Sequence, residues 1–261
     1  MGLGVEIIGL LVLVAFVAGT IDAIAGGGGL LTIPALLAAG LPPVAAIATN
    51  KVQSACGTGG AVFAFARKGH VDLRRFALPA LASFAGSAVG AWVLTRIDPR
   101  FLAGLIPVLL IVMIIYYVFS PRMTDEDRHT LAGGGLLLVF CAAVGWYDGF
   151  FGPGTGSFFT TGLVAVFGLG LTRAVAHTKL LNFASNLAGL AVLVAGGHVV
   201  WLVGLTMALG SLAGGQFGAH LAIRFGTRAV RPLLIVMCLA LTIKLLADPA
   251  NPLTAFALAR L

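Results

Sequence analysis

The stretch GTIDAIAGGGGLLTIP at residues 19–34 decides the fold, because its pattern returns as GWYDGFFGPGTGSFFT at residues 145–160. Each copy has a glycine, an aspartate three residues later, and a glycine-rich run that begins four residues after the aspartate. Glycine has low helix propensity and follows an apolar segment here, so the pattern predicts a helix that breaks and restarts. Two such breaks indicate an internal duplication.

The duplication extends well beyond the two breaks. Asn50-Lys51 corresponds to Thr178-Lys179, residues 69–71 correspond to 197–199, and residues 109–113 correspond to 233–237. The blocks keep their order and their offsets vary only between 124 and 128 residues. We therefore predict two homologous repeats at 1–120 and 131–261, joined by a hydrophilic cytoplasmic linker at 121–130 within one integral membrane domain.

The composition predicts an all-α polytopic membrane protein. Of the 261 residues, 59% are hydrophobic and only 10% are charged, whereas soluble domains carry about 25% charged residues. Each repeat reads as five apolar segments, of which the second, after the glycine-rich break, is too short to span a bilayer and is predicted to be a half-length helix. The ten segments are 4–25, 30–40, 43–66, 73–95, 101–119, 131–150, 156–168, 171–195, 199–223 and 230–247.

The distribution of Lys and Arg predicts the orientation. If every segment crosses, ten of these residues lie in loops on one side and three on the other. The positive-inside rule makes the side with ten charges cytoplasmic. The loop at 67–75 is basic, whereas its equivalent near 196–199 has no Lys or Arg, so we expect the two repeats to be inverted relative to each other.

Lys51 and Lys179 predict the sign of the substrate. A lysine at the centre of a span costs ~2.5–3.5 kcal/mol on insertion scales and therefore usually has a partner or a function. Alternatively, each could extend its ammonium to a membrane surface. Polar neighbours favour a site for a small oxyanion. The predicted substrate-binding residues are Asn50, Lys51, Gln53, Ser54, Thr58, Gly27, Gly28, Thr178, Lys179, Asn182, Asn186, Gly154 and Thr155.

The glycine-rich breaks favour a transporter. Inverted repeats with interrupted segments at matching places are typical of secondary transporters, whose substrate site lies near the bilayer midplane. Freed backbone N–H groups could bind an anion there, although glycine runs also suit tight helix packing. We therefore expect alternating access between the two repeats.

Asp22 and Asp148 are the acidic residues that both repeats share, and three interpretations stay open for them. They could carry a proton or a cation, pair with the two lysines, or cap the half-length helix that follows. His177 is a further candidate for proton coupling, whereas His70 and His198 are expected at the membrane interface.

Other classes of function are disfavoured. The net charge of +7 is spread over short loops with no interleaved aromatic residues, so nucleic-acid binding is not expected. The three cysteines lie in apolar segments without metal-ligand spacing, so no metal and no cofactor are predicted. A hydrolytic dyad of Ser157 with His177 or His198 is disfavoured because the first repeat has no equivalent serine, and the chain is not expected to be an enzyme.

The chain resembles the sulfite exporter TauE/SafE family of bacterial membrane transporters. The resemblance lies in the glycine run at 26–29 with Asp22 and Pro34, and in the blocks at 48–53, 57–60 and 67–69. The second copy departs from it, with His177-Thr178-Lys179 in place of Thr49-Asn50-Lys51. The resemblance implies transport of sulfite, sulfonates and related small organic anions across the bacterial inner membrane.

The expected function is secondary transport of a small sulfur-containing or carboxylate anion, with a proton or another ion as a coupling partner. The alternatives are a passive anion channel and a cation carrier centred on Asp22 and Asp148. The expected partners are the small anion and the lipid bilayer, with a homodimer as a plausible assembly.

Overall fold

The computed structural model describes residues 4–119, 133–225 and 243, and within these ranges every regular element is an α-helix. In chain order the helices are α1 Val5–Ala25, α2 Gly29–Ala38, α3 Pro43–Arg67, α4 Leu73–Leu94, α5 Pro99–Phe119, α6 Gly134–Phe150, α7 Thr155–Ala165, α8 Leu171–Ala195 and α9 Trp201–Phe225. They coincide with the first nine predicted segments, within a few residues at each end. The predicted linker at 121–130, the tenth segment apart from residue 243, and Cys238 lie outside the described residues.

Both glycine-rich breaks are turns in which the backbone adopts positive φ. Gly26 ends α1 at φ 77°, and Gly152 and Gly154 have φ 96° and 80° between α6 and α7. Such values favour glycine, because a Cβ would crowd the backbone. The helices that follow, α2 and α7, have ten and eleven residues. Each is therefore roughly 15 Å long, about half the thickness of the hydrocarbon core.

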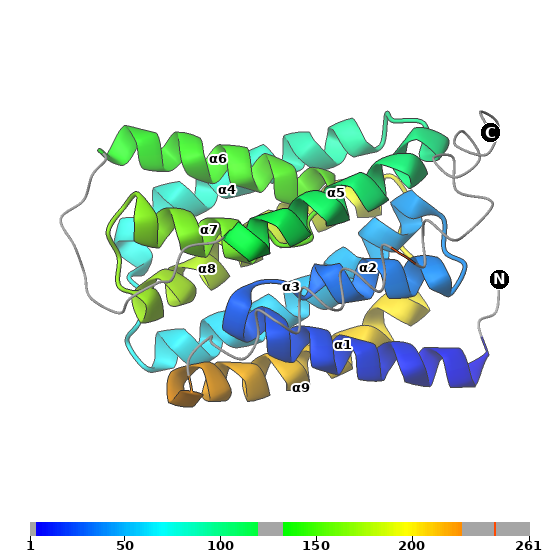
Figure 1. The fold of residues 1–261 in the computed structure, drawn as a ribbon, viewed down its shortest axis with the longest axis horizontal. Helices are drawn as coiled ribbons and strands as arrows, with labels where there is room; N and C mark the ends of the chain where they lie inside the picture. The colour runs from blue at the N-terminus through cyan, green and yellow to red at the C-terminus, as the bar shows by residue number, and fades with distance from the viewer. Residues whose placement is uncertain (1–3, 120–132, 226–242, 244–261) are drawn as a thin grey trace.

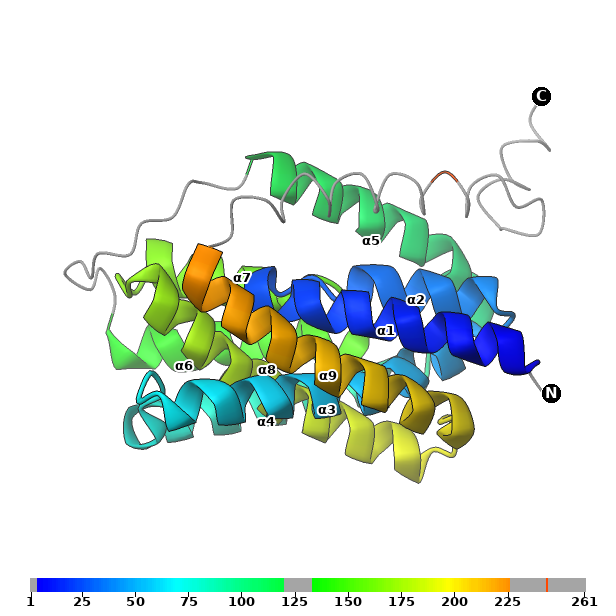
Figure 2. The same ribbon diagram turned by 90° about the horizontal axis from the view of Figure 1, so that it is seen from below.

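Each break folds one long and one half-length helix into a hairpin. In Figure 1, α1 begins at the right-hand end of the bundle and α2 returns toward that end. By contrast, α6 begins at the left-hand end, and α7 returns to the left. The two hairpins thus enter the bundle from opposite ends. Helices α3, α4, α8 and α9 run along the bundle beside them, as the second view also shows (Figure 2).

The two halves of the chain are interleaved. Helix α1 packs along α9 and α6 packs along α4, so in both pairs a helix of one half contacts a helix of the other. Glycines permit the close approach: a Cβ at Gly214 would overlap the carbonyl oxygen of Phe16, and a Cβ at Gly90 would overlap that of Trp146. Small residues at such contacts are typical of helix packing in membranes. Each half therefore needs the other to complete its packing.

The outer faces of the bundle are apolar. Leu78, Leu81 and Trp92 on α4, and Leu205 and Leu209 on α9, are large exposed hydrophobic side chains. In the described part of the chain, α1, α4, α8 and α9 are long and apolar enough to cross a membrane. In lipid such faces are solvated favourably, which agrees with a multi-pass membrane protein.

Candidate functional site

Helices α3 and α8 carry a concentration of buried polar side chains in the centre of the bundle. Lys51 on α3 and Lys179 on α8 are each 1% exposed and are among the largest fully buried side chains of the described residues. The ammonium groups therefore do not reach a surface, which excludes the alternative in which each extends to the membrane interface. A buried charge requires a partner of opposite charge.

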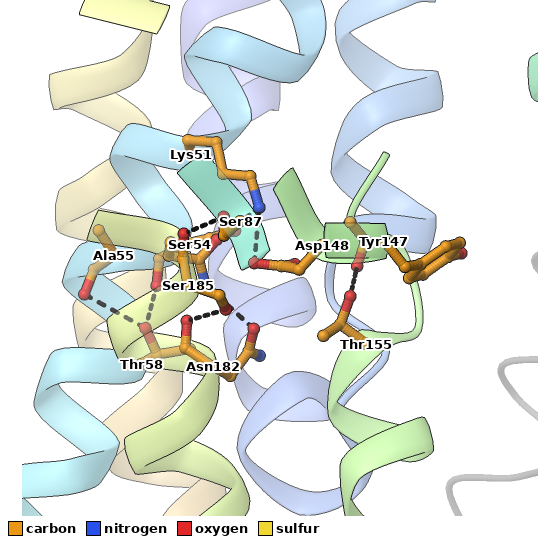
Figure 3. Close-up of polar contacts among 12 residues, drawn as sticks. Lys51, Ser54, Ala55, Thr58, Ser87, Tyr147, Asp148, Thr155, Asn182 and Ser185 are labelled. Atoms are coloured by element: carbon orange, nitrogen blue, oxygen red, sulfur yellow. Dashed lines mark hydrogen bonds and ion pairs between the residues drawn. The ribbon is translucent and has the colours of Figure 1, made fainter. Parts of the chain in front are cut away.

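Lys51 is paired with Asp148 of α6. Its Nζ lies 2.8 Å from Asp148 Oδ2, and only 1% and 3% of the two side chains are exposed. Lys51 Nζ also donates to Asn186 Oδ1 on α8 at 3.1 Å. Figure 3 shows the lysine side chain directed toward the aspartate from the opposite helix. A residue of the first half is thus neutralised by a residue of the second.

Lys179 is paired with Asp22 of α1 in the reciprocal way. Its Nζ lies 3.0 Å from Asp22 Oδ2, and it also donates to the main-chain carbonyl of Asp22. The backbone N–H of Gly28 donates to Asp22 Oδ1 at 3.2 Å. The side chain of Asp22 is 20% exposed, so this pair is more open than the pair of Lys51 and Asp148.

These contacts bear on the three interpretations left open for the aspartates. Both pair with a lysine, and Asp22 in addition binds a backbone N–H at the break that precedes α2. Asp22 therefore pairs with Lys179 and also binds the backbone of the break, but neither aspartate caps the half-length helix that follows it. Whether either carboxylate carries a proton stays a prediction.

A small polar cavity of about 20 Å³ lies beside the aspartates of both ion pairs. Of the predicted site residues, those that line it are Asp22, Asn50, Ser54, Thr58, Asp148, Gly154, Asn182 and Asn186. Gly26, Gly29 and Gly152 complete the lining from the two breaks. The cavity is therefore surrounded by amides, hydroxyls, glycine backbone and two carboxylates, and in this conformation it has room for about one water molecule.

The other predicted residues are placed around this cavity. Gln53 and Gly28 line a second small cavity beside it, together with Ser54 and Thr58. Thr178 accepts a hydrogen bond from Thr160 at 3.1 Å. Gly27 and Thr155 do not line either cavity, and Thr155 Oγ1 donates instead to the carbonyl of Gly152 at 2.6 Å. The predicted residues thus lie close together, but only some of them line a cavity.

Sequence reasoning missed two threonines on the half-length helices. Thr32 on α2 donates to Asn50 Oδ1 at 2.5 Å, and that oxygen also accepts from Gln53 at 2.7 Å. Thr160 on α7 makes the equivalent bond to Thr178. In both repeats the threonine precedes its partner by 18 residues. This equal spacing was the signal that could have found them.

The two breaks touch each other beside the cavity. A Cβ at Gly26 would overlap the backbone of Gly156, and a Cβ at Gly156 would crowd Gly26 in return. Met113 of α5 covers the second break, where its side chain occupies the space that a Cβ of Gly154 would need. Glycine at these positions therefore serves close packing as well as access to the cavity, and the two interpretations of the glycine runs are compatible.

His177 lies away from the cavity, at the end of the bundle where α4 and α8 begin. Its Nε2 accepts the backbone N–H of Asp72 at 3.0 Å, and its Nδ1 lies 2.7 Å from the carbonyl oxygen of Arg173. The ring stacks on Phe76 with centroids 3.8 Å apart. These contacts occupy both ring nitrogens of His177 with backbone groups, and its part in proton coupling stays a prediction.

Known proteins resemble this chain over nearly its whole length. The family described as "Sulfite exporter TauE/SafE" matches residues 11–245. The "Probable membrane transporter protein ORF9" of Sinorhizobium is 44% identical over 252 residues, covering 96% of this chain and 97% of the relative. The "Probable membrane transporter protein" of Haemophilus influenzae is 41% identical, covering 95% and 98%.

A third relative, the "Probable membrane transporter protein YfcA" of Escherichia coli K12, is 40% identical over 243 residues, which is 93% of this chain and 90% of the relative. No solved structure matches the chain significantly. The family and the relatives are named as transporters, which agrees with the expectation of a protein other than an enzyme. The chain belongs to the sulfite exporter TauE/SafE family and is a multi-pass membrane transporter of that family.

Proposed function

We propose that the protein is a secondary transporter of a small oxyanion, of the sulfite, organosulfonate or short carboxylate class. The observation that carries the proposal is the pair of buried lysines, each held by an aspartate of the other half beside one polar cavity. Ammonium, amide and hydroxyl donors are the groups that bind oxyanions in proteins. The family name supports the sulfur-containing members of this class.

The two ion pairs leave the site without net charge, and this constrains how an anion binds. An anion that takes the place of a carboxylate at Lys179 leaves the carboxylate of Asp22 without its partner. A buried unpaired carboxylate is strongly unfavourable, so uptake of a proton by Asp22 accompanies anion binding. This exchange couples anion binding to proton uptake. Asp22 would take up the proton if the anion binds at Lys179, and Asp148 would do so if it binds at Lys51.

Alternating access follows from an inverted relation of the halves. Three features support it: α1 and α6 begin at opposite ends of the bundle, the ion pairs are reciprocal, and the contacts of α1 with α9 mirror those of α6 with α4. Transporters built in this way rock one repeat against the other around a fixed central site. The touching breaks at Gly26 and Gly156 lie next to that centre.

The positions of the basic loops support insertion in the bacterial inner membrane. The end of the bundle that carries these loops would face the cytoplasm. In Figure 1 the connection from α3 to α4 and the start of α8 lie at the left-hand end, whereas the connection from α4 to α5 lies at the right-hand end. The first two carry residues 67–75 and Arg173, and the third carries Arg96 and Arg100. The positive-inside rule then puts the left-hand end in the cytoplasm. A cation carrier centred on Asp22 and Asp148 is less well supported, because both carboxylates are engaged by lysines.

Ligand-induced stabilisation of the purified protein tests the proposal. The panel comprises sulfite, thiosulfate, sulfate, sulfoacetate, taurine, short carboxylates and chloride. A ligand at 100 times its Kd stabilises by roughly 2.7 kcal/mol, which a thermal shift resolves. Uptake by proteoliposomes then separates a carrier, which saturates and responds to a proton gradient, from a channel, which does neither. Mass measurement in the same detergent tests the expected homodimer.

The decisive variant removes a whole ion pair. Lys179→Ala alone would leave Asp22 without its partner, whereas Lys179→Met with Asp22→Leu removes both charges and is expected to fold. We expect the double variant to lose anion binding and uptake, while the exposed control Lys68→Met keeps both. Normal uptake by the folded double variant would overturn the proposal.

A further inference from the structure

Asp22 borders two cavities. Besides the central cavity it lines the second small cavity, which has a volume of about 10 Å³ and lies between α1, α3 and α9. A cavity of about this size holds one water molecule when polar groups surround it. The polar side chains in its lining are those of Asp22, Gln53, Ser54, Thr58 and Ser211. We call it the side cavity.

The hydroxyl of Ser211 can bind a water molecule in the side cavity. Ser211 is 2% exposed, and its hydroxyl forms no hydrogen bond with any of the described residues. Burial of such a group is unfavourable unless it finds a partner. The equivalent residue of the other repeat, Ser83, donates to the carbonyl of Leu181 at 3.0 Å. Ser211 therefore offers a donor that Ser83 has already used.

Two positions beside the side cavity differ between the repeats. Gly57 lines the cavity, and a Cβ at Gly215 of α9 would lie 2.8 Å from the carbonyl oxygen of Gly57. At the equivalent positions the other repeat has Ser185 and Ser87. Ser87 Oγ donates to the carbonyl of Ser185 at 2.6 Å (Figure 3). Serine side chains thus fill the space next to the less exposed ion pair, whereas glycines leave it open on the side of Asp22.

The exposure of the two aspartates agrees with this difference. The side chain of Asp22 is 20% exposed and lines both cavities, whereas that of Asp148 is 3% exposed and lines only the central one of the two. A carboxylate takes up a proton when a donor lies within hydrogen-bond reach, and one intervening water molecule can provide it. Water can therefore reach Asp22 from one cavity more than it can reach Asp148.

The charged group in contact with Asp22 is the ammonium of Lys179 on α8. From the first break the N–H of Gly28 donates to the carboxylate, and the side chains that α3 and α9 contribute to the side cavity are uncharged. Asp148 lines the other side of the central cavity and is itself paired with Lys51. If an anion takes Lys179, the neighbours of Asp22 are therefore neutral groups and water.

These observations distinguish the two carboxylates. Resting on the proposed function above, we infer that Asp22 takes up the proton that accompanies anion binding, and that a water molecule bound to Ser211 in the side cavity delivers it. The water gives a proton to a carboxylate oxygen of Asp22 and receives one from a hydronium ion of the aqueous phase. An O–H bond thus forms on Asp22 and the water is regenerated. Asp148 keeps its ion pair with Lys51 throughout.

Anion binding at different pH values tests the choice of Asp22. The experiment uses the full-length protein in detergent and an anion of the panel above whose own charge is constant over the pH range. If each anion brings one proton, its Kd falls roughly tenfold for each pH unit by which the pH is lowered. Asp22→Asn imitates the protonated carboxyl group. We expect this variant to bind the anion as tightly at alkaline pH as the unaltered protein does in acid, with no dependence on pH.

Two matched double variants test the side cavity. A Cβ at Gly57 would lie 2.3 Å from Ser211 Oγ but 3.4 Å from Ser211 Cβ, so Gly57→Ala with Ser211→Ala replaces the hydroxyl by a methyl that fits. Ser83→Ala with Ser185→Ala places the same alanines at the equivalent positions. A pH indicator in weakly buffered solution follows proton uptake after rapid mixing with the anion. We expect the first variant to slow it roughly a hundredfold at unchanged Kd, and the second to change neither.

The outcomes separate Asp22 and its water from the proposed function. A pH dependence of Kd that persists in Asp22→Asn would assign the proton to another group. An unchanged rate in the first alanine variant, or equal slowing in both, would overturn delivery through the side cavity. The alanine variants keep both ion pairs, so their test does not depend on the stability of Asp22→Asn. Anion binding without proton uptake by the unaltered protein would overturn the coupling but not the anion site. Failure to bind any anion of the panel would overturn both.

Discussion

The two lysine–aspartate pairs have the same chemistry but different surroundings. The pair of Lys51 and Asp148 is sealed, with 3% of the aspartate side chain exposed, whereas 20% of the Asp22 side chain is exposed beside Lys179. Lys51 has an additional side-chain acceptor in Asn186, but the additional acceptor of Lys179 is the backbone of Asp22 itself. Duplicated residues have thus come to differ: one pair is suited to hold the halves together, and the other to exchange its carboxylate for an anion.

The largest predicted effect separates the two aspartates. Asp148→Leu should reduce the free energy of unfolding by about 3–5 kcal/mol, because it leaves a buried ammonium without its carboxylate. Asp22→Leu should cost less, since that site is partly open. Chemical unfolding in detergent measures both, with Lys51→Met added to Asp148→Leu as the variant that restores stability. Equal losses for the two single variants would remove the distinction between the pairs.

A second comparison concerns two glycines with similar backbone conformations. Gly40→Ala, at φ 90° in open space, should lower stability by about 1–2 kcal/mol from left-handed strain alone. Gly26→Ala, at φ 77°, should lower it further, because the new methyl would overlap the backbone of Gly156. Thermal unfolding of both variants measures the difference. If the two alanines had the same effect, the contact between the breaks would not contribute to stability.

A smaller effect is expected where His177 and Thr49 accept equivalent backbone hydrogen bonds, from the N–H groups of Asp72 and Val200. His177→Leu should lose about 1 kcal/mol more than His177→Gln, since a glutamine amide oxygen lies about as far along the side chain as Nε2 and can still accept the N–H of Asp72. Protonation of the imidazole turns both nitrogens into donors, so acid should weaken this bond in the unaltered protein but not in the glutamine variant. Hydrogen exchange at the Asp72 amide measures this bond directly, and identical protection in both variants would contradict it.

The smallest predicted effect lies at the cap of α4. The N–H of Arg75, which binds the exposed carboxylate, lowers the pKa of Asp72 from its ordinary value of 3.8. Stabilisation from a lowered pKa is full above the ordinary value and is lost as the pH falls through the lowered one. Asp72→Asn keeps an acceptor at the cap without titrating. As the pH is lowered to 3, the unaltered protein should therefore lose slightly more in melting temperature than the Asp72→Asn variant does. A difference between the two melting temperatures that does not change with pH would count against the cap.

The sequence predicted the helices and the polar centre because both depend on local pattern. Apolar segments broken by glycine locate α1 to α9, and the lysines stand out as charges within spans. Pairing of the aspartates with the lysines was one of three interpretations, but which aspartate pairs with which lysine could not be predicted, because it depends on how α6 packs beside α3 and α8. The same holds for the hydrogen bond from the Asp72 N–H to His177, which depends on how α4 packs beside α8.

The interleaving of the halves has a consequence for synthesis. Asp22 and Lys179 are 157 residues apart in the chain, so at 5–20 residues per second the aspartate emerges roughly 10–30 s before its partner. Until then α1 also lacks α9. Until the second half is synthesised, the first half therefore lies in the membrane with the carboxylate of Asp22 not yet neutralised by Lys179. The fold is completed only when translation is complete.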